Sequence, residues 1–431
     1  MSIAAYFKSL YNNPSVKSVG IYTFTNFFSK AVSFLLLFVF TDPVYISPSE
    51  NGLLSLFSTS MLFLMPFLSM GVIHSVSADY YKLEKTAFRN FFTTSFIIPV
   101  VVMLLSAGLL FLFRQQLQHN YGLPAMFTWL IPLVTFLIFC NEQLLSMARN
   151  NNEPAVYLKA NIGKAILEFG LSFILVVWMA YRWQGRIAGI LAAYTVLFFY
   201  AVYYFKKKGY LFGSVKKQYL YSELLYAIPI IAMQAAIFSM SASDKFFLSN
   251  FTDDHNETVG VYSIACVFAS IVNVLSMALL QYYFPKVYSM LSSKSVEYAA
   301  IKKHFTYYFL ILTAGTLLTI VFTPLLYHLF INDRYHDALR YNFLLCIGSY
   351  LWGITYFFYS FLLFYKEKRK LLLLSLCCIA VSLCSNYLLI KSGGAYGAAV
   401  SVCIAYLIVF IITLFFTRPY WKRFFNKADS N

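Results

Sequence analysis

The feature that most constrains this chain is a series of long apolar stretches that recurs along its whole length. A helix needs roughly 20 apolar residues to cross about 30 Å of hydrocarbon, and the 431-residue sequence contains twelve such stretches. They lie at 19–41, 53–78, 91–113, 127–147, 161–181, 187–205, 224–248, 259–284, 305–330, 343–365, 371–390 and 397–416. Hydrophobic residues make up 60% of the chain and charged residues only 12%, too few to cover a soluble protein. The sequence therefore predicts an all-α polytopic membrane protein with twelve transmembrane helices.

The basic residues are distributed unequally between the two sets of connections. The termini and the loops after even-numbered spans carry 24 of the 33 Lys and Arg residues, whereas the opposite loops carry only six. Basic residues collect in cytoplasmic loops, so both termini are expected in the cytoplasm. The net charge of +16 has the same explanation, and we expect no nucleic acid as a partner.

The longest of the predicted cytoplasmic loops divides the chain into two halves of six spans. We expect an amino-terminal lobe, a basic linker, a carboxy-terminal lobe and a cytoplasmic tail, at 1–205, 206–223, 224–416 and 417–431. The second span of each half begins alike, with Asn51-Gly52-Leu53-Leu54-Ser55 and Val259-Gly260-Val261-Tyr262-Ser263. Because six is even, the two repeats are parallel, which suits transport by alternating access around a central cavity.

Six charged residues lie inside the predicted spans, namely Lys30, Glu142, Lys164, Glu168, Asp244 and Lys245. A charge at the membrane centre costs about 2.5–3.5 kcal/mol on insertion scales and usually faces a cavity or a partner. Lys30 shares one helix face with Thr23, Asn26 and Ser33, and its own helix contains no acid. This pattern favours an anionic ligand near Lys30, and an acid on a neighbouring helix is the alternative.

The seventh and eighth spans carry further polar residues at helical spacing. Gln234, Ser241 and Lys245 share one face of the seventh span, and Asn273 lies on a polar stripe of the eighth. Adjacent side chains on a helix do not face each other, so Asp244 and Lys245 are not expected to form a mutual pair. Binding in a cavity and hydrogen bonding between helices both remain open for these residues.

Two acids in the amino-terminal half have structural and functional interpretations. Lys164 and Glu168 are spaced i, i+4, which predicts a salt bridge inside that lobe. The alternative is that Glu168 carries a coupling proton, because burial raises the pKa of a carboxyl group. Glu142 lies near the predicted cytoplasmic end of the fourth span, and we expect it to reach the interface.

No pattern in the sequence indicates an enzyme, a cofactor or a metal site. The six histidines are scattered without the HExxH spacing, and there is no phosphate-binding loop or Gly-rich dinucleotide motif. The seven cysteines lie in apolar runs, which is typical of small buried residues. We therefore expect no catalytic residues, no cofactor and no metal ligands.

Several motifs resemble those of one transporter family. Pro229, Ser243-Asp244-Lys245-Phe246 and Gly260-x-Tyr262-Ser263-x-Ala265 resemble the seventh and eighth helices of polysaccharide-type lipid flippases, with Lys245 where an Arg is usual. The segment 46–52 and Met70-Gly71 resemble their first outside loop and the end of their second helix. These flippases, which include the O-antigen flippases, belong to the multidrug/oligosaccharidyl-lipid/polysaccharide exporter superfamily.

The resemblance implies a flippase for undecaprenyl-diphosphate-linked oligosaccharide, the repeat unit of O-antigen in lipopolysaccharide or of another surface polysaccharide, in the bacterial inner membrane. Lys30 and Lys245 are then expected to meet the diphosphate, and Asn26, Gln234 and Asn273 to bind the substrate in the cavity. The expected partners are this lipid-linked glycan, the bilayer and a polysaccharide polymerase. The alternatives are an ion-coupled multidrug or cation antiporter of the same superfamily and, from another class, a membrane glycosyltransferase or polymerase.

Overall fold

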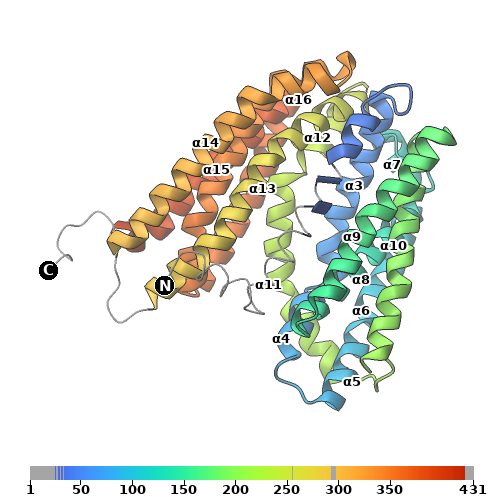
Figure 1. Cartoon of the computed structure of the whole chain (residues 1–431), viewed down its shortest axis with the longest axis vertical. Helices are drawn as coiled ribbons and strands as arrows, with labels where there is room; N and C mark the ends of the chain where they lie inside the picture. Colours follow the sequence, from blue (N-terminus) through green and yellow to red (C-terminus); the bar gives the residue numbers. More distant parts are fainter. Residues whose placement is uncertain are drawn as a thin grey trace, which may run out of the picture. The chain divides into compact units, whose positions relative to one another are not determined.

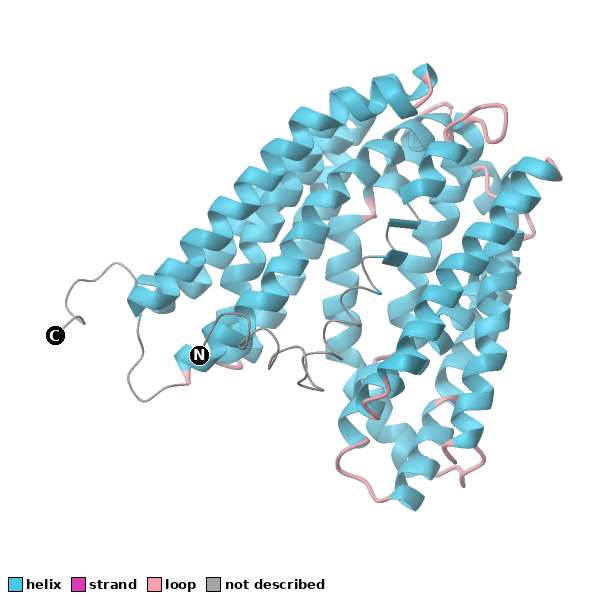
Figure 2. Cartoon of the chain, viewed as in Figure 1, coloured by secondary structure: helices cyan, strands magenta, loops and turns pink. Residues whose placement is uncertain are grey.

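The computed structural model describes residues 25, 28–29, 31–32, 34–254, 256–292 and 298–422. Within these ranges the regular elements are helices and there is no strand (Figure 2). Ten of the described helices are long and apolar enough to cross a membrane. These observations confirm a multi-pass, all-α membrane protein.

The 54-residue helix α16 (Lys368–Trp421) accounts for two of the predicted spans. Gly394 has φ 52° and ψ −134°, which interrupts the helix near its middle. The interruption lies between the predicted spans 371–390 and 397–416, where the sequence predicts a loop. The first predicted span, 19–41, is described only in part.

Contacts between residues group the chain into two compact units, each of which we describe by itself. Unit 1 comprises Met1–Glu50, Ser60–His119 and Leu123–Ile231, and unit 2 comprises Asn51–Thr59, Asn120–Gly122 and Ala232–Asn431. Helices α3 (Pro48–Ser69) and α11 (Lys217–Ser241) contribute residues to both units. The remaining helices shown in Figure 1 belong wholly or almost wholly to one unit.

Unit 1 is built from short helices near its ends and four long ones. These elements are α4 (Val72–Asp79), α5 (Lys85–Ser95), α6 (Ile97–Leu112), α7 (Arg114–Tyr121), α8 (Phe127–Asn150), α9 (Pro154–Phe173), the π-helical turn Ile174–Trp178 and α10 (Arg182–Lys207). Its core contains an aromatic cluster in which the Phe92 ring lies 5.0 Å from that of Phe205 and 4.8 Å from that of Phe96. Aromatic pairs at such distances stabilise a core beyond their buried area.

Unit 2 contains the longest helices of the chain. Its elements are α12 (Asp244–Phe251), α13 (Glu257–Leu291), α14 (Tyr298–Phe330), the 3₁₀ helix Asp333–Ala338, α15 (Leu339–Phe364) and α16, of which α13, α14 and α16 are the longest. Helices α13 to α16 run alongside one another in Figure 1. Trp352 of α15 stacks on Tyr406 of α16 with ring centroids 5.1 Å apart, which joins two of these helices in the core.

Two of the predicted spans are interrupted. The predicted span 53–78 breaks after α3, where Met70 (φ 42°) and Gly71 (φ 75°) have left-handed backbone conformations that end a helix. A Cβ atom on Gly71 would lie 2.7 Å from the terminal methyl group of Ile230, so a larger residue would also require that side chain to move. The predicted span 224–248 breaks between α11 and α12, at residues 242–243.

Candidate functional site: polar residues within the helices

The break between α11 and α12 places Asp244 in the first turn of α12, where it is 4% exposed. Its carboxylate accepts hydrogen bonds from the Tyr262 hydroxyl, at 2.6 Å, and from the Lys245 backbone N–H, at 3.0 Å. A buried carboxylate needs such donors because burial removes the water that would otherwise solvate it. The sequence singled out both Asp244 and Tyr262, and the structure brings them into direct contact.

A chain of neutral side chains continues from this break into α16. Ser243 donates to the Ser239 carbonyl at 2.6 Å, and Asn386 donates to the Ser243 hydroxyl at 3.0 Å. Ser401 donates to the Asn386 amide oxygen at 2.6 Å. Asn386 and Ser401 lie on opposite sides of the Gly394 interruption, so this network joins both parts of α16 to the interrupted helix.

Lys245, Gln234 and Asn273, the predicted substrate-binding residues of unit 2, are placed separately. Within the described residues the half-buried Lys245 ammonium forms no ion pair, which agrees with the prediction that Asp244 and Lys245 do not pair. The Gln234 amide oxygen is buried and has no hydrogen-bond partner in the described structure. Asn273 donates to Ser349 at 3.3 Å, which is the interhelical bond considered as its alternative role.

Glu168 in unit 1 has a different partner from the one predicted. Its carboxylate pairs with the Arg186 guanidinium of α10 at 2.7 Å, and Arg186 also donates to the Ser172 hydroxyl at 2.9 Å. The predicted Lys164–Glu168 salt bridge is therefore wrong. The Lys164 ammonium instead lies 5.6 Å from the centre of the Tyr194 ring. The i, i+4 pattern did not predict this pairing because the planar guanidinium of Arg186 donates from one nitrogen to Glu168 and from another to Ser172. The single ammonium of a lysine is less suited to such a forked contact.

Glu142 lies further inside its helix than the sequence predicted. Helix α8 continues to Asn150, which puts Glu142 about 12 Å from the helix end at 1.5 Å per residue. Its nearest charges are those of Lys164 and Arg149, and no ion pair or hydrogen bond of its carboxylate is found within the described residues. Its expected position at the membrane interface stays a prediction from the sequence.

The residues on either side of Glu142 are unusual. Asn141 is 1% exposed and Gln143 is 0% exposed, yet neither side-chain amide has a hydrogen-bond partner in the described structure. Burying an amide without a partner costs free energy, so this turn of α8 is a polar site whose hydrogen-bonding capacity the described residues do not use. Only the Glu142 part of this site was predicted.

The two predicted binding residues of the first span, Lys30 and Asn26, lie outside the described residues. Their neighbour Ser29 is described, and its hydroxyl lies 3.2 Å from the side-chain oxygen of Asn161 on α9. The proposed role of Lys30 and Asn26 therefore stays a prediction from the sequence.

Sequence reasoning missed two buried polar contacts of unit 1. Arg186 was assigned to an outside loop. It lies just before the predicted span that follows the span of Glu168, and its charge is opposite to that of Glu168. Glu223 was assigned to the linker, but it is 2% exposed and accepts a hydrogen bond from Ser75 at 2.7 Å. The only sequence signal for the burial of Glu223 was its negative charge in a predicted linker that is otherwise rich in lysine. In the structure this residue is the seventh of α11.

The part of the chain that the structure describes contains no group of three metal-ligating side chains. The seven cysteines are all described and are free thiols. The charged and amide side chains listed above are thus the candidate site residues, and they form two separate sets, one in each unit.

No protein-family model matches the sequence, and no curated protein is significantly similar to it. Its fold, however, is similar to those of solved membrane proteins. The lipid II flippase MurJ in an inward closed conformation aligns with 92% of this chain and 87% of its own, at TM-score 0.73 and 13% identity.

Multidrug transporters align equally far along the chain. An inward-facing multidrug resistance MATE family transporter of the MOP superfamily covers 91% of this chain and 96% of its own, at TM-score 0.66 and 15% identity. A MATE structure in the straight conformation covers 96% and 98%, at TM-score 0.61 and 15% identity. At these identities the similarity establishes the fold alone: the chain has the helical membrane fold of MATE transporters and of the lipid II flippase.

Proposed function

We propose that this protein is a flippase that moves undecaprenyl-diphosphate-linked oligosaccharide across the bacterial inner membrane by alternating access. The observation that carries this proposal is the similarity to the lipid II flippase over 92% of the chain at TM-score 0.73. The flippase-like motifs around Asp244 and Tyr262 support it, because these residues form one buried contact in unit 2.

The chemistry of such a substrate explains why cations belong in the transport path. A diphosphate headgroup carries negative charge that hydrocarbon cannot solvate. Lys245 has no ion-pair partner within the described residues, and the ammonium of a lysine is a strongly hydrated point charge suited to phosphate. Lys245 and Lys30 are the proposed diphosphate-binding residues, with Asn26, Gln234 and Asn273 as proposed polar contacts to the headgroup.

Substitution of Lys30 tests the proposal. We expect Lys30→Ala to abolish or severely reduce glycan export, and Lys30→Arg to retain part of it because the positive charge is kept. Export of the surface glycan is measured in a null strain complemented with each variant at matched protein level. Lys391→Ala is the matched control, since Lys391 is an exposed lysine on α16. Normal export by Lys30→Ala would remove Lys30 from the transport path.

The second candidate function is ion-coupled multidrug or cation antiport, and the MATE similarities favour it. Such a carrier needs a negative site for its ion, and Glu142 is a half-buried carboxylate without an ion-pair partner in the described structure. Drug resistance in a susceptible strain separates the two functions. A flippase restores glycan export without changing resistance, whereas an antiporter raises resistance and leaves export absent.

The alternative from another class, a membrane glycosyltransferase or polymerase, gains no support from these similarities. A flippase leaves its substrate chemically unchanged. The lipid-linked oligosaccharide that accumulates in a null strain should therefore have the same mass as the lipid-linked oligosaccharide that is translocated in the complemented strain, whereas loss of a glycosyltransferase would leave it shorter by a sugar. The proposed partners remain the lipid-linked glycan, the bilayer and a polysaccharide polymerase that uses the translocated unit. The proposed location is the inner membrane with both termini in the cytoplasm.

A further inference from the structure

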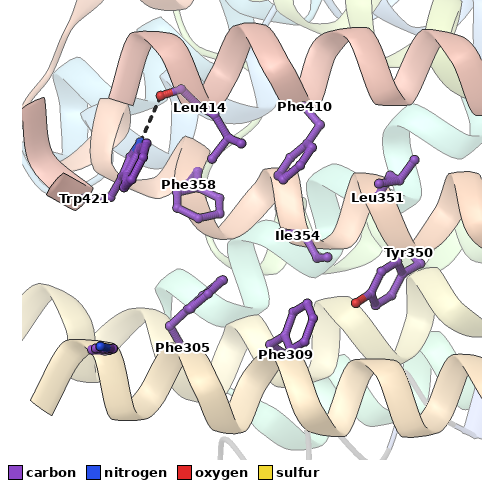
Figure 3. Close-up of a pocket in the computed structure, with 10 residues that line it drawn as sticks. Phe305, Phe309, Tyr350, Leu351, Ile354, Phe358, Phe410, Leu414 and Trp421 are labelled. Atoms are coloured by element: carbon purple, nitrogen blue, oxygen red, sulfur yellow. Dashed lines mark hydrogen bonds between the residues drawn. The ribbon is translucent and has the colours of Figure 1, made fainter. Parts of the chain in front are cut away.

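A groove lined by aromatic and aliphatic side chains lies on unit 2 between α14, α15 and the second part of α16. It encloses about 430 Å³, within the size range of ligand pockets, about 300–1,000 Å³. Figure 3 shows Phe305 and Phe309 projecting from one helix toward Phe358 and Phe410. The Phe305 ring lies 5.3 Å from that of Phe358, and the Phe309 ring lies 6.2 Å from that of Tyr350.

One end of the groove is basic. Lys302, one turn before Phe305 on α14, lines it together with Trp421, the last residue of α16. Lys303, Arg418 and Lys422 lie within one turn of these two residues and are exposed. The opposite end, at Tyr350 and Leu351, carries no charged lining residue.

Among the described residues around this end, basic side chains greatly outnumber acidic ones. In the described segments 298–306, 364–370 and 417–422, Glu367 is the single acid among eight Lys and Arg residues. Its carboxylate already accepts hydrogen bonds from Lys370 and from the Tyr420 hydroxyl. The basic end therefore presents an excess of positive charge at the ends of three membrane helices.

We infer that this groove binds one acyl chain of an anionic glycerophospholipid, whose phosphate lies at the basic end beside Lys302 and Lys422. Basic pockets between the cytoplasmic ends of membrane helices attract anionic lipid headgroups, and the sequence predicts these ends to be cytoplasmic. The apolar lining is matched to hydrocarbon and contains few hydrogen-bonding groups.

The length of the groove favours an acyl chain over the much longer polyprenyl chain of a carrier lipid. Lys302 and Phe309 are seven residues apart on α14, which corresponds to about 10 Å at 1.5 Å per residue. One leaflet of the hydrocarbon core is about 15 Å deep, half of the roughly 30 Å total. The groove thus follows a single chain through most of one leaflet and ends before the membrane centre.

The exposed surface of α14 supports a lipid environment at the groove. Leu310, Leu317, Leu318, Val321 and Phe322 are all more than half exposed, as expected for side chains that face hydrocarbon. A lipid can therefore enter the groove sideways from the bilayer, without passing through the interior of either unit. This site is independent of the proposed transport path and does not rest on the proposed function.

Competition between lipids tests the inference on the purified full-length protein by native mass spectrometry. We expect phosphatidylglycerol to bind more tightly than phosphatidylcholine, and undecaprenyl phosphate not to displace it. Lys302→Gln/Lys422→Gln should weaken phosphatidylglycerol binding by about 30-fold, equivalent to ~1 kcal/mol for each juxtamembrane cation. The matched control Lys368→Gln/Arg369→Gln removes the same charge from residues that do not line the groove, and should have a smaller effect.

A steric variant and a labelling experiment keep the test independent of charge. Leu351→Trp fills the groove and should reduce binding of both phospholipids, with size-exclusion profile and melting temperature confirming the fold. A phosphatidylglycerol with a photoreactive acyl chain should label segment 305–309. Equal affinity for the two phospholipids, displacement by undecaprenyl phosphate, equal loss in the control variant, or labelling only elsewhere would each overturn the inference.

Discussion

The α8–α9 turn of unit 1 and the α15–α16 turn of unit 2 each hold an acid that accepts hydrogen bonds from a tyrosine and a lysine, although the lysines come from different positions. In unit 1, Glu153 precedes α9 and accepts hydrogen bonds from Tyr204, at 2.6 Å, and from Lys208, at 2.5 Å. In unit 2, Glu367 precedes α16 and accepts hydrogen bonds from Tyr420 and from Lys370, the latter at 3.2 Å. Each tyrosine lies near the end of the last long helix of its half.

The electrostatics of the two turns agree as well. Burial raises the pKa of Glu153, but the hydrogen bonds from Lys208 and Tyr204 and the charges of Lys208 and Lys207 outweigh it and hold the pKa below its ordinary value. The hydrogen bonds from Tyr420 and Lys370 likewise lower the pKa of Glu367. Within the sequence, the similarity of the two halves was found only at the second span of each half. The two turns add a similarity that involves the fourth, fifth and sixth spans.

The two units differ in the polar side chains of their interiors, although the turns at their ends are similar. Unit 1 holds an ion pair, Glu168–Arg186, together with Glu142 and two buried amides that lack partners in the described structure. Unit 2 holds Asp244 hydrogen-bonded to the Tyr262 hydroxyl, and next to it in the chain Ser243 begins a separate network of hydroxyl and amide groups. The two units thus share the chemistry of one turn and differ in the polar groups of their interiors.

Breaking the ion pair of unit 1 should have the largest effect on stability. Glu168→Gln leaves the partly buried Arg186 without its counter-charge, and we expect a loss of about 3 kcal/mol in the free energy of unfolding, the lower end of the range for buried pairs. The double variant Glu168→Leu/Arg186→Met removes both charges and should recover most of this loss. Unfolding of the purified protein in mixed micelles measures both.

Lys164→Met is the matched control for this prediction. It removes a cation of α9 that forms no salt bridge with Glu168 in the structure, and we expect a much smaller loss. If Lys164→Met were as destabilising as Glu168→Gln, the pairing with Arg186 would be contradicted in favour of the i, i+4 pair.

The corresponding test in unit 2 removes one donor to Asp244. Tyr262→Phe deletes the hydroxyl that donates to the carboxylate at 2.6 Å, and hydrogen bonds to charged groups contribute about 1.5–3 kcal/mol. We expect a loss of stability of that size. Tyr327→Phe is the matched control, because the Tyr327 hydroxyl is equally buried and has no partner in the described structure. Similar losses in the two variants would contradict a specific role of the Tyr262 hydrogen bond.

Much of the fold followed from the sequence because hydrophobic length is set by the thickness of the bilayer. The apolar stretches predicted the long helices, and Gly394 lies where a loop was expected. The break at residues 242–243 was not predicted, since Ser243 and Asp244 are polar residues inside an otherwise continuous apolar run. Their side chains bond to other helices, and such long-range contacts leave no periodic pattern in one sequence.

The sequence predicted most of the charged residues inside the helices but fewer of the contacts that they form. Five of the six charged residues predicted inside the spans lie on described helices, namely Glu142, Lys164, Glu168, Asp244 and Lys245. The lack of an Asp244–Lys245 pair followed from helix geometry. The partner of Glu168 did not follow, because Arg186 is 18 residues away and on the next helix. The unpartnered amides of Asn141 and Gln143 could not be found either, since a sequence does not show which amides lack partners.

Paired substitutions of buried asparagines should change stability in opposite directions in the two units. Asn386→Leu removes an amide that bonds to Ser243 and Ser401, and we expect a loss of about 1–3 kcal/mol. Asn141→Leu replaces an amide that has no partner among the described residues by an apolar side chain of similar size, which relieves a desolvation cost of about 1–3 kcal/mol. The free energy of unfolding of each variant, compared with that of the unmodified protein, tests whether the two changes have opposite signs. A loss in Asn141→Leu would show instead that the amide holds water or an ion that stabilises unit 1.

The smallest expected effect concerns the two similar turns. Because the pKa of Glu153 is lower in the folded protein, its interactions stabilise the fold above the unfolded pKa, about 4.3, and are lost as the pH falls through the lower, folded value. The pair with Lys208 is largely solvent-exposed, so its contribution is about 0–1 kcal/mol and should decrease at high salt. Glu367 should behave in the same direction.

Melting temperatures of Glu153→Gln and Glu367→Gln, measured from pH 7 down to pH 3, test the equivalence of the two turns. Each variant should melt below the unmodified protein at pH 7 and approach it at the acidic end, where the unmodified carboxylate is protonated and the substitution removes nothing further. Glu84→Gln is the control, an exposed acid before α5 without an ion pair in the described structure. A pH-dependent difference in only one of the two variants would show that the arrangements look alike but act differently.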